Sequence, residues 1–99
     1  MPTTTTEPEA RQMFMVVGTI RQDTDFDELA ARRADEHRQL MLLQSQGKVG
    51  AHHLSFERMT VFLEVFATDR DDCAEILASL PFRDFFDPDA YPISSPPAS

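Results

Sequence analysis

Three residues that could together move a proton lie close to one another in the sequence: Arg33, Glu36 and His37. A carboxylate can take up and return a proton. A guanidinium or imidazole can stabilise the oxyanion that forms when a proton leaves a carbon beside a carbonyl. On a helix, steps of about 100° from Phe26 place Arg33 and His37 near the middle of an apolar sector and Glu36 at its edge. All three side chains would then point toward the interior.

Burial of these ionisable groups permits two interpretations, because an unpartnered buried charge costs several kcal/mol or is neutralised. In the first, Arg33 and Glu36 form an ion pair at the edge of a packed helix, and His37 is a hydrogen-bonded core residue. In the second, a water-poor pocket raises the pKa of Glu36, which shuttles a proton while Arg33 or His37 holds an anionic or enolate oxygen.

The adjacent pair His52 and His53 is the second candidate feature. Successive strand residues face opposite sides of a sheet, so only one of the pair can share a pocket with the helix. His52 has the same parity as Leu54 and is the better candidate. A two-histidine, one-carboxylate metal site from His37, His52 and Glu36 is conceivable, but the spacing matches no recognised ligand pattern. We therefore expect neither metal nor cofactor.

These patterns select eight candidate site residues for a small-molecule substrate. The predicted catalytic residues are Glu36, His37 and His52. The predicted substrate-binding residues are Arg33, His53, Phe14, Phe62 and Met41.

Other chemistry has little support in the sequence. Cys73 is the only cysteine, which excludes a disulfide within the chain and a multi-cysteine zinc site. Neighbouring acids such as Asp72 and Glu75 oppose a thiolate, so we expect Cys73 to be a packing residue. No phosphate-binding loop, dinucleotide-binding glycine motif or serine-hydrolase elbow is present.

Composition narrows the class of protein further. The 99 residues suit one domain, and 17 acidic against 9 basic residues give a net charge of -8. That charge repels nucleic acid and anionic membranes. No apolar stretch is long enough to span a membrane, and residues 1–10 do not resemble a secretory signal, so we expect a cytoplasmic protein. We predict a disordered arm over 1–10, one domain over 11–93 and a flexible tail over 94–99.

The elements that must position the candidates follow from local patterns. Residues 13–20 form an apolar run typical of a buried strand. Asp25, with Glu28 three residues on, predicts the start of a helix of about twenty residues that ends before Gly47. Residues 49–56 and 59–66 predict a hairpin with a turn at 57–58.

A second helix and a last strand complete the chain. Residues 68–72 offer several acidic or hydroxyl caps, and the 72–75 segment has the form of another capping box. Pro81 ends the helical stripe that follows. Pro88 and Pro92 limit a strand within 82–93 to a sheet edge.

The resulting order predicts an α+β, ferredoxin-like βαββαβ domain, with a four-stranded antiparallel sheet covered by two helices on one face. Phe14, Phe62 and Phe66 cannot all lie beneath the helices if side chains alternate along each strand. We therefore expect the other face to pair with a second copy in a dimeric α+β barrel, giving a homodimer or higher homo-oligomer.

Several short motifs resemble those of the bacterial muconolactone isomerases, in order and in spacing. They are RADEH at 33–37, LQSQGK at 43–48, LASLPF at 77–82 and FFD at 85–87. The resemblance implies a ferredoxin-like fold, sheet-mediated dimers that assemble into rings, and isomerisation of an unsaturated lactone by proton transfer without metal or organic cofactor. The family's acid/base glutamate corresponds to Glu36.

The chain departs from that family where the substrate carboxylate would be held. It has no tryptophan, the strand at 49–54 reads VGAHHL, and the tail at 94–97 reads SSPP. His37 stands where the family has lysine. These departures predict a less acidic or larger oxygenated ring, such as a lactone, enone or polyketide-like intermediate.

Three functions follow as hypotheses. The first is a cofactor-independent isomerase or cyclase that uses Glu36 for proton transfer. The second is a cofactor-free monooxygenase, in which the substrate's own anion reacts with oxygen. The third is a non-catalytic ligand-binding or assembly module.

Overall fold

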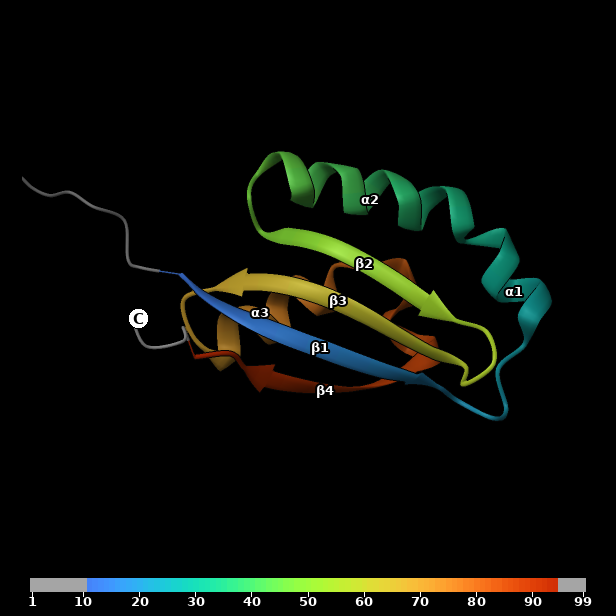
Figure 1. Ribbon diagram of the computed structural model, residues 1–99. Coiled ribbons are helices and arrows are strands. Elements are labelled where there is room, and N and C mark those ends of the chain that lie inside the picture. Colours follow the sequence, from blue (N-terminus) through green and yellow to red (C-terminus); the bar gives the residue numbers. More distant parts are fainter. Residues whose placement is uncertain (1–10, 95–99) are drawn as a thin grey trace, which may run out of the picture.

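A computed structural model describes residues 11–94 and confirms the predicted α+β, ferredoxin-like fold (Figure 1). The predicted arm, 1–10, and residues 95–99 of the predicted tail lie outside the described residues. None of the helices within 11–94 is long and apolar enough to cross a membrane. The elements in chain order are β1 (Gln12–Ile20), α1 (Phe26–Ala31), α2 (Arg33–Ser45), β2 (Val49–Ser55), β3 (Thr60–Ala67), α3 (Arg70–Ala78), the 3-10 turn η1 (Pro81–Phe85) and β4 (Phe86–Pro92).

The four strands form one antiparallel sheet in the order β2-β3-β1-β4. Alternate side chains of β1 and β3 are buried against the helices, because successive strand residues face opposite sides. Phe14 and Val65 are among the most completely buried side chains, as is Cys73 of α3, which confirms the packing position predicted for the cysteine. The proline-containing strand β4 lies at an edge, as predicted.

The predicted single helix after β1 is wrong: the chain forms two helices that break at Arg32. Asp25 caps α1 as expected, accepting hydrogen bonds from the backbone N–H groups of Asp27 and Glu28 at 3.0 and 3.3 Å. At Arg32, however, φ is -95° and ψ is 1°, outside the helical region. The apolar positions before and after the break therefore do not share one continuous helical stripe.

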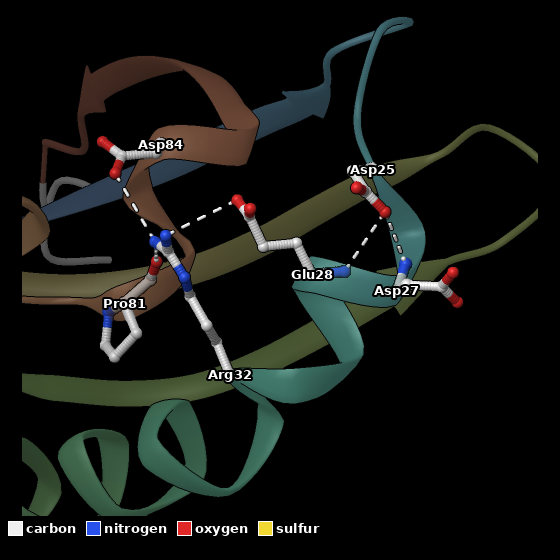
Figure 2. A network of polar contacts seen from close by, with 6 residues as sticks. All are labelled: Asp25, Asp27, Glu28, Arg32, Pro81 and Asp84. Atoms are coloured by element: carbon white, nitrogen blue, oxygen red, sulfur yellow. Dashed lines mark hydrogen bonds and ion pairs between the residues drawn. The ribbon is translucent and has the colours of Figure 1, made fainter.

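Long-range contacts of the Arg32 side chain hold this break (Figure 2). Its guanidinium donates to the Pro81 carbonyl oxygen at 3.3 Å and lies 5.1 Å from the centroid of the Phe85 ring. It also forms ion pairs with Glu28 and Asp84, both at 3.5 Å. Arg32 thus ties the α1–α2 junction to η1.

Helix α3 begins at one of the caps predicted within 68–72 and not at the capping box of 72–75. Asp69 caps it by accepting from the backbone N–H of Asp72 at 2.8 Å. The Asp72 carboxylate accepts in turn from the backbone N–H of Thr68 at 2.9 Å. The reciprocal bonds therefore lie one helical turn before the predicted box, because Asp69 is an equally good cap nearer the end of β3.

A β-bulge in β2 sets which side chains of that strand face the helices. Val49 pairs with Val65, and His52 pairs with Leu63, so two residues of β2 oppose Glu64 between these pairs. The Glu64 carboxylate accepts from the Ala51 N–H at 3.0 Å. In a regular strand, Val49 and His52 would face opposite sides, because they are three positions apart. The bulge brings both to the helix-covered face.

Candidate functional site

A cavity of about 570 Å³ lies between the helix-covered face of the sheet and the elements α1, α2, α3 and η1. We call it the sheet–helix cavity. Its floor is made of buried apolar side chains from the sheet, from α2 and α3, and from the segment between α3 and η1. These floor residues are Val16, Ile20, Leu40, Leu63, Leu77 and Leu80.

Glu36 is the only buried polar or charged residue within 11–94, with 9% of its surface exposed. It lies on α2 in line with Leu40 and Leu43, and its side chain borders the cavity. Its Oε1 accepts a hydrogen bond from the Phe82 backbone N–H at 2.9 Å. Within the described residues this is the only hydrogen bond to the carboxylate.

Burial raises the pKa of the Glu36 carboxyl, because an apolar environment disfavours its charged form. The hydrogen bond from Phe82 acts in the opposite direction and offsets part of this increase. A carboxyl with a raised pKa, beside a cavity and held by one donor, is suited to exchange a proton with a bound molecule.

The structure reverses the predicted positions of the three ionisable residues on the helix. Glu36 is buried, whereas Arg33 and His37 are exposed and border the cavity from the solvent side. The break at Arg32 explains the difference. The 100° steps start at Phe26, and the helix that contains Phe26 ends before Arg33. No ion pair joins Arg33 to Glu36 in the described part of the chain, so the ion-pair interpretation is wrong.

All three histidines of the sequence border the sheet–helix cavity. His52 pairs with buried Leu63 and so projects toward the helices, whereas His53 pairs with Phe62 and projects from the opposite face. His53 nevertheless borders the cavity. The imidazole on the helix-covered face of the sheet, the face that Glu36 packs against, is therefore that of His52, as the alternation along the strand predicts.

The ionisable residues around this cavity are mostly basic, whereas those of the whole chain are mostly acidic. Glu36 is the cavity's only acidic residue, whereas Arg33, Arg83 and the histidines supply five basic side chains. The chain as a whole carries a net charge of -8. Electropositive groups around an apolar space favour an anion, or an oxygen that gains negative charge during a reaction.

Arg83 and the Phe82 N–H are site groups that sequence reasoning missed. Both belong to η1, and Arg83 also donates to the Phe86 carbonyl oxygen at 3.3 Å. Pro81 signals the start of a turn, but no spacing rule connects that turn to Glu36, 46 positions earlier. A backbone donor also has no signature in residue type.

Three residues predicted to bind substrate lie away from the cavity. Phe14 is fully buried in the core because its position on β1 faces the packed part of the helices. Phe62 faces the uncovered side of the sheet, with 36% of its surface exposed. Met41 lies on the outer surface of α2, 51% exposed. These placements correct the sequence-based expectation.

Within residues 11–94, no three histidine, cysteine, aspartate or glutamate side chains are placed to hold one metal ion. The conceivable set of His37, His52 and Glu36 is therefore not assembled as a ligand group.

No protein-family model matches the chain, and a search of curated proteins finds no match. The resemblance to muconolactone isomerases therefore remains a prediction based on short motifs.

Proposed function

We propose that this protein is a cofactor-independent isomerase or cyclase that acts on a small oxygenated ring compound by proton transfer. The observation that supports this most strongly is Glu36, a buried carboxyl beside a cavity with an apolar floor. Burial of an ionisable group without a charged partner opposes folding and suggests a use for that group.

In the proposed reaction, the Glu36 carboxylate removes a proton from a carbon next to the substrate carbonyl. The electron pair moves to the carbonyl oxygen as an enolate, which Arg33, His37 or His52 stabilises. Return of the proton from Glu36 to another carbon completes an isomerisation. Attack of the enolate carbon on an electrophilic carbon of the same molecule would instead close a ring.

The Phe82 N–H has a positioning role in this proposal. By donating to Oε1, it fixes the carboxylate and leaves Oε2 for the substrate proton. It also keeps the pKa of Glu36 from rising as far as burial alone would take it.

A substrate screen tests the proposal. Unsaturated lactones, enones and multi-ring enolisable ketones are incubated with the protein and followed by NMR and with an oxygen electrode. We expect a product of unchanged mass that forms without oxygen uptake. Product formation coupled to oxygen consumption would support a monooxygenase instead. Binding without conversion across the panel would support a non-catalytic ligand-binding module.

We also propose that two copies associate through the uncovered side of the sheet. We call this side the open sheet face, and within 11–94 it carries no helix. Side chains of β1 and β3 on it are only half-buried or exposed in the single chain. Glu64 lies among them, opposite Met15, and its carboxylate accepts from the Ala51 N–H. The rest of the surface around these strands is apolar. Its central residues are Met13, Met15, Val17, Phe62 and Phe66.

A further inference from the structure

We infer that the ligand of the sheet–helix cavity is a multi-ring, mostly apolar molecule with one anionic or enolisable oxygen group. The oxygen group would reach Glu36, and the ring system would extend out through the mouth of the cavity. The reacting end of this molecule rests on the proposed function, whereas the size and apolar character of the molecule follow from the cavity alone.

The volume of the cavity exceeds what a single-ring acid requires. At roughly 30 Å³ for each water-sized group, about 570 Å³ holds on the order of 20 non-hydrogen atoms. A one-ring lactone acid has about ten non-hydrogen atoms, so on the same scale it would leave about half the space empty. The volume lies within the range of pockets that take drug-sized ligands.

The mouth of the cavity extends the apolar surface outward. Residues that border the cavity and are also exposed must lie where it meets solvent. Three large apolar side chains meet this condition: Phe26 at 53%, Leu54 at 48% and Phe56 at 77% exposed. We call these three residues the cavity mouth. They come from the start of α1 and from the end of β2 with the turn that follows it.

The turn beside the mouth adopts an unusual backbone conformation. Met59 has φ of 48°, in the left-handed region that residues other than glycine rarely enter, and its side chain borders the cavity. This conformation, stabilised by a hydrogen bond from the Met59 N–H to the Phe56 carbonyl oxygen, holds the turn against the cavity.

The charged groups define the other end of the ligand. Arg33 and His37 are exposed and lie on the same helix as Glu36, within one turn of it. An oxygen group near Glu36 therefore lies beside Arg33 and His37 of α2. Phe26, Leu54 and Phe56 add apolar surface where the cavity meets solvent, next to the imidazoles of His52 and His53. A molecule with one oxygenated end and one apolar end matches this division.

Fluorescent probes of different size and charge test the inference. The probes are 2-anthroate, a three-ring anion, its neutral relative 2-anthracenemethanol, and benzoate as a one-ring anion that competes for the site. We expect 2-anthroate to bind at least about tenfold more tightly than benzoate. Equal binding of 2-anthroate and benzoate would overturn the inference.

Variants locate the bound probe. We expect Phe56→Ser and Leu54→Ser to weaken 2-anthroate binding about fivefold each. Two matched controls should leave it unchanged: Phe62→Ser on the open sheet face and Leu42→Ser on the outer surface of α2. Loss of binding in Phe62→Ser with no effect of Phe56→Ser would place the probe on the open sheet face and overturn the inference.

Two further measurements separate this inference from its alternatives. Arg33→Gln should weaken binding of 2-anthroate but not of 2-anthracenemethanol. Equal effects on the two probes would overturn the inference that the anionic group of the ligand lies beside Arg33. A change of oligomeric mass in Phe56→Ser would show that the mouth is a protein contact and would also overturn it. Glu36→Gln should retain probe binding. Probe binding therefore tests the proposed class of ligand, and turnover tests the proposed function, in separate measurements.

Discussion

Glu36 shows how one residue can be placed against its own solvation preference. A carboxyl in an apolar setting is costly to ionise, and the described residues give it a single backbone donor instead of a cationic partner. A bidentate arginine would have fixed the charge and removed its basicity. One N–H from Phe82 orients the group and leaves its proton exchangeable.

The raised pKa of Glu36 predicts a pH dependence of stability. Its ordinary value is 4.5, and its folded value is higher because of burial. Between these two values the folded chain binds more protons than the unfolded chain, so this group's contribution to the free energy of unfolding falls as pH rises, then levels off. Below pH 4.5 the penalty is absent.

Urea unfolding from pH 4 to pH 8 measures this effect. We expect wild type to lose stability relative to Glu36→Gln as pH rises above about 4.5. The exposed-carboxyl control Glu75→Gln should track wild type. A wild-type to Glu36→Gln difference that stays constant with pH would show that burial does not perturb this carboxyl.

The adjacent histidines provide a matched pair at the same scale. The strand register directs His52 toward the cavity and His53 toward the open sheet face. We expect His52→Ala to lower turnover about tenfold or more, through loss of a group that stabilises the enolate, and His53→Ala to have little effect. The reverse order of effects, measured as kcat for the substrate found in the screen, would contradict the register-based assignment.

At the scale of elements, the α1–α2 break and η1 form one unit held by Arg32. Removing this guanidinium in Arg32→Met takes away a hydrogen bond to Pro81, two partly exposed ion pairs and a stacking contact with Phe85. We expect a loss of about 1–2 kcal/mol in the free energy of unfolding. Turnover should fall as well, because η1 carries the Phe82 donor.

Arg38→Met is the matched control for Arg32→Met. Arg38 lies on α2, which begins directly after Arg32, and pairs with Asp35 at 2.7 Å, but both side chains are largely exposed. Such pairs contribute little to stability. Equal losses of stability and turnover in the two variants would show that the Arg32 network has no special role.

The elements differ in how far local sequence determines them. The strands follow from short apolar runs, and their order predicts the ferredoxin-like topology. The break at Arg32 has no local signal, because all its side-chain contacts except the ion pair with Glu28 lie about fifty positions away, at Pro81, Asp84 and Phe85. Because this break has no local signal, the helical periodicity predicted the wrong burial for Arg33 and His37. Glu36 is nevertheless the carboxyl that the sequence predicts as the acid/base group.

At the scale of the whole molecule, the open sheet face predicts association of two chains. Light scattering should give wild type a mass of at least twice the 11.2 kDa of one chain. We expect Met15→Glu to yield folded monomers, because it places a second carboxylate directly opposite Glu64 at the centre of that face. Met41→Glu, at an exposed apolar position on α2, is the control and should remain dimeric.

Two results would contradict this assembly. One is a wild-type mass of a single chain at micromolar concentration, and the other is a dimer that persists in Met15→Glu. Circular dichroism of each variant distinguishes dissociation from unfolding. The open sheet face itself was predictable from the alternation of aromatic residues along the strands, whereas no local pattern predicts the size of an assembly.

The central claim is that Glu36 transfers the substrate proton, and deuterium incorporation tests it most directly. The compound converted most rapidly in the substrate screen is incubated in deuterated water, and deuterium at the carbon next to the carbonyl is followed by NMR. We expect Glu36→Gln to slow incorporation by about 10²-fold or more, while the neighbouring exposed variant Asp35→Asn exchanges at the wild-type rate. Undiminished incorporation in folded Glu36→Gln would contradict the account.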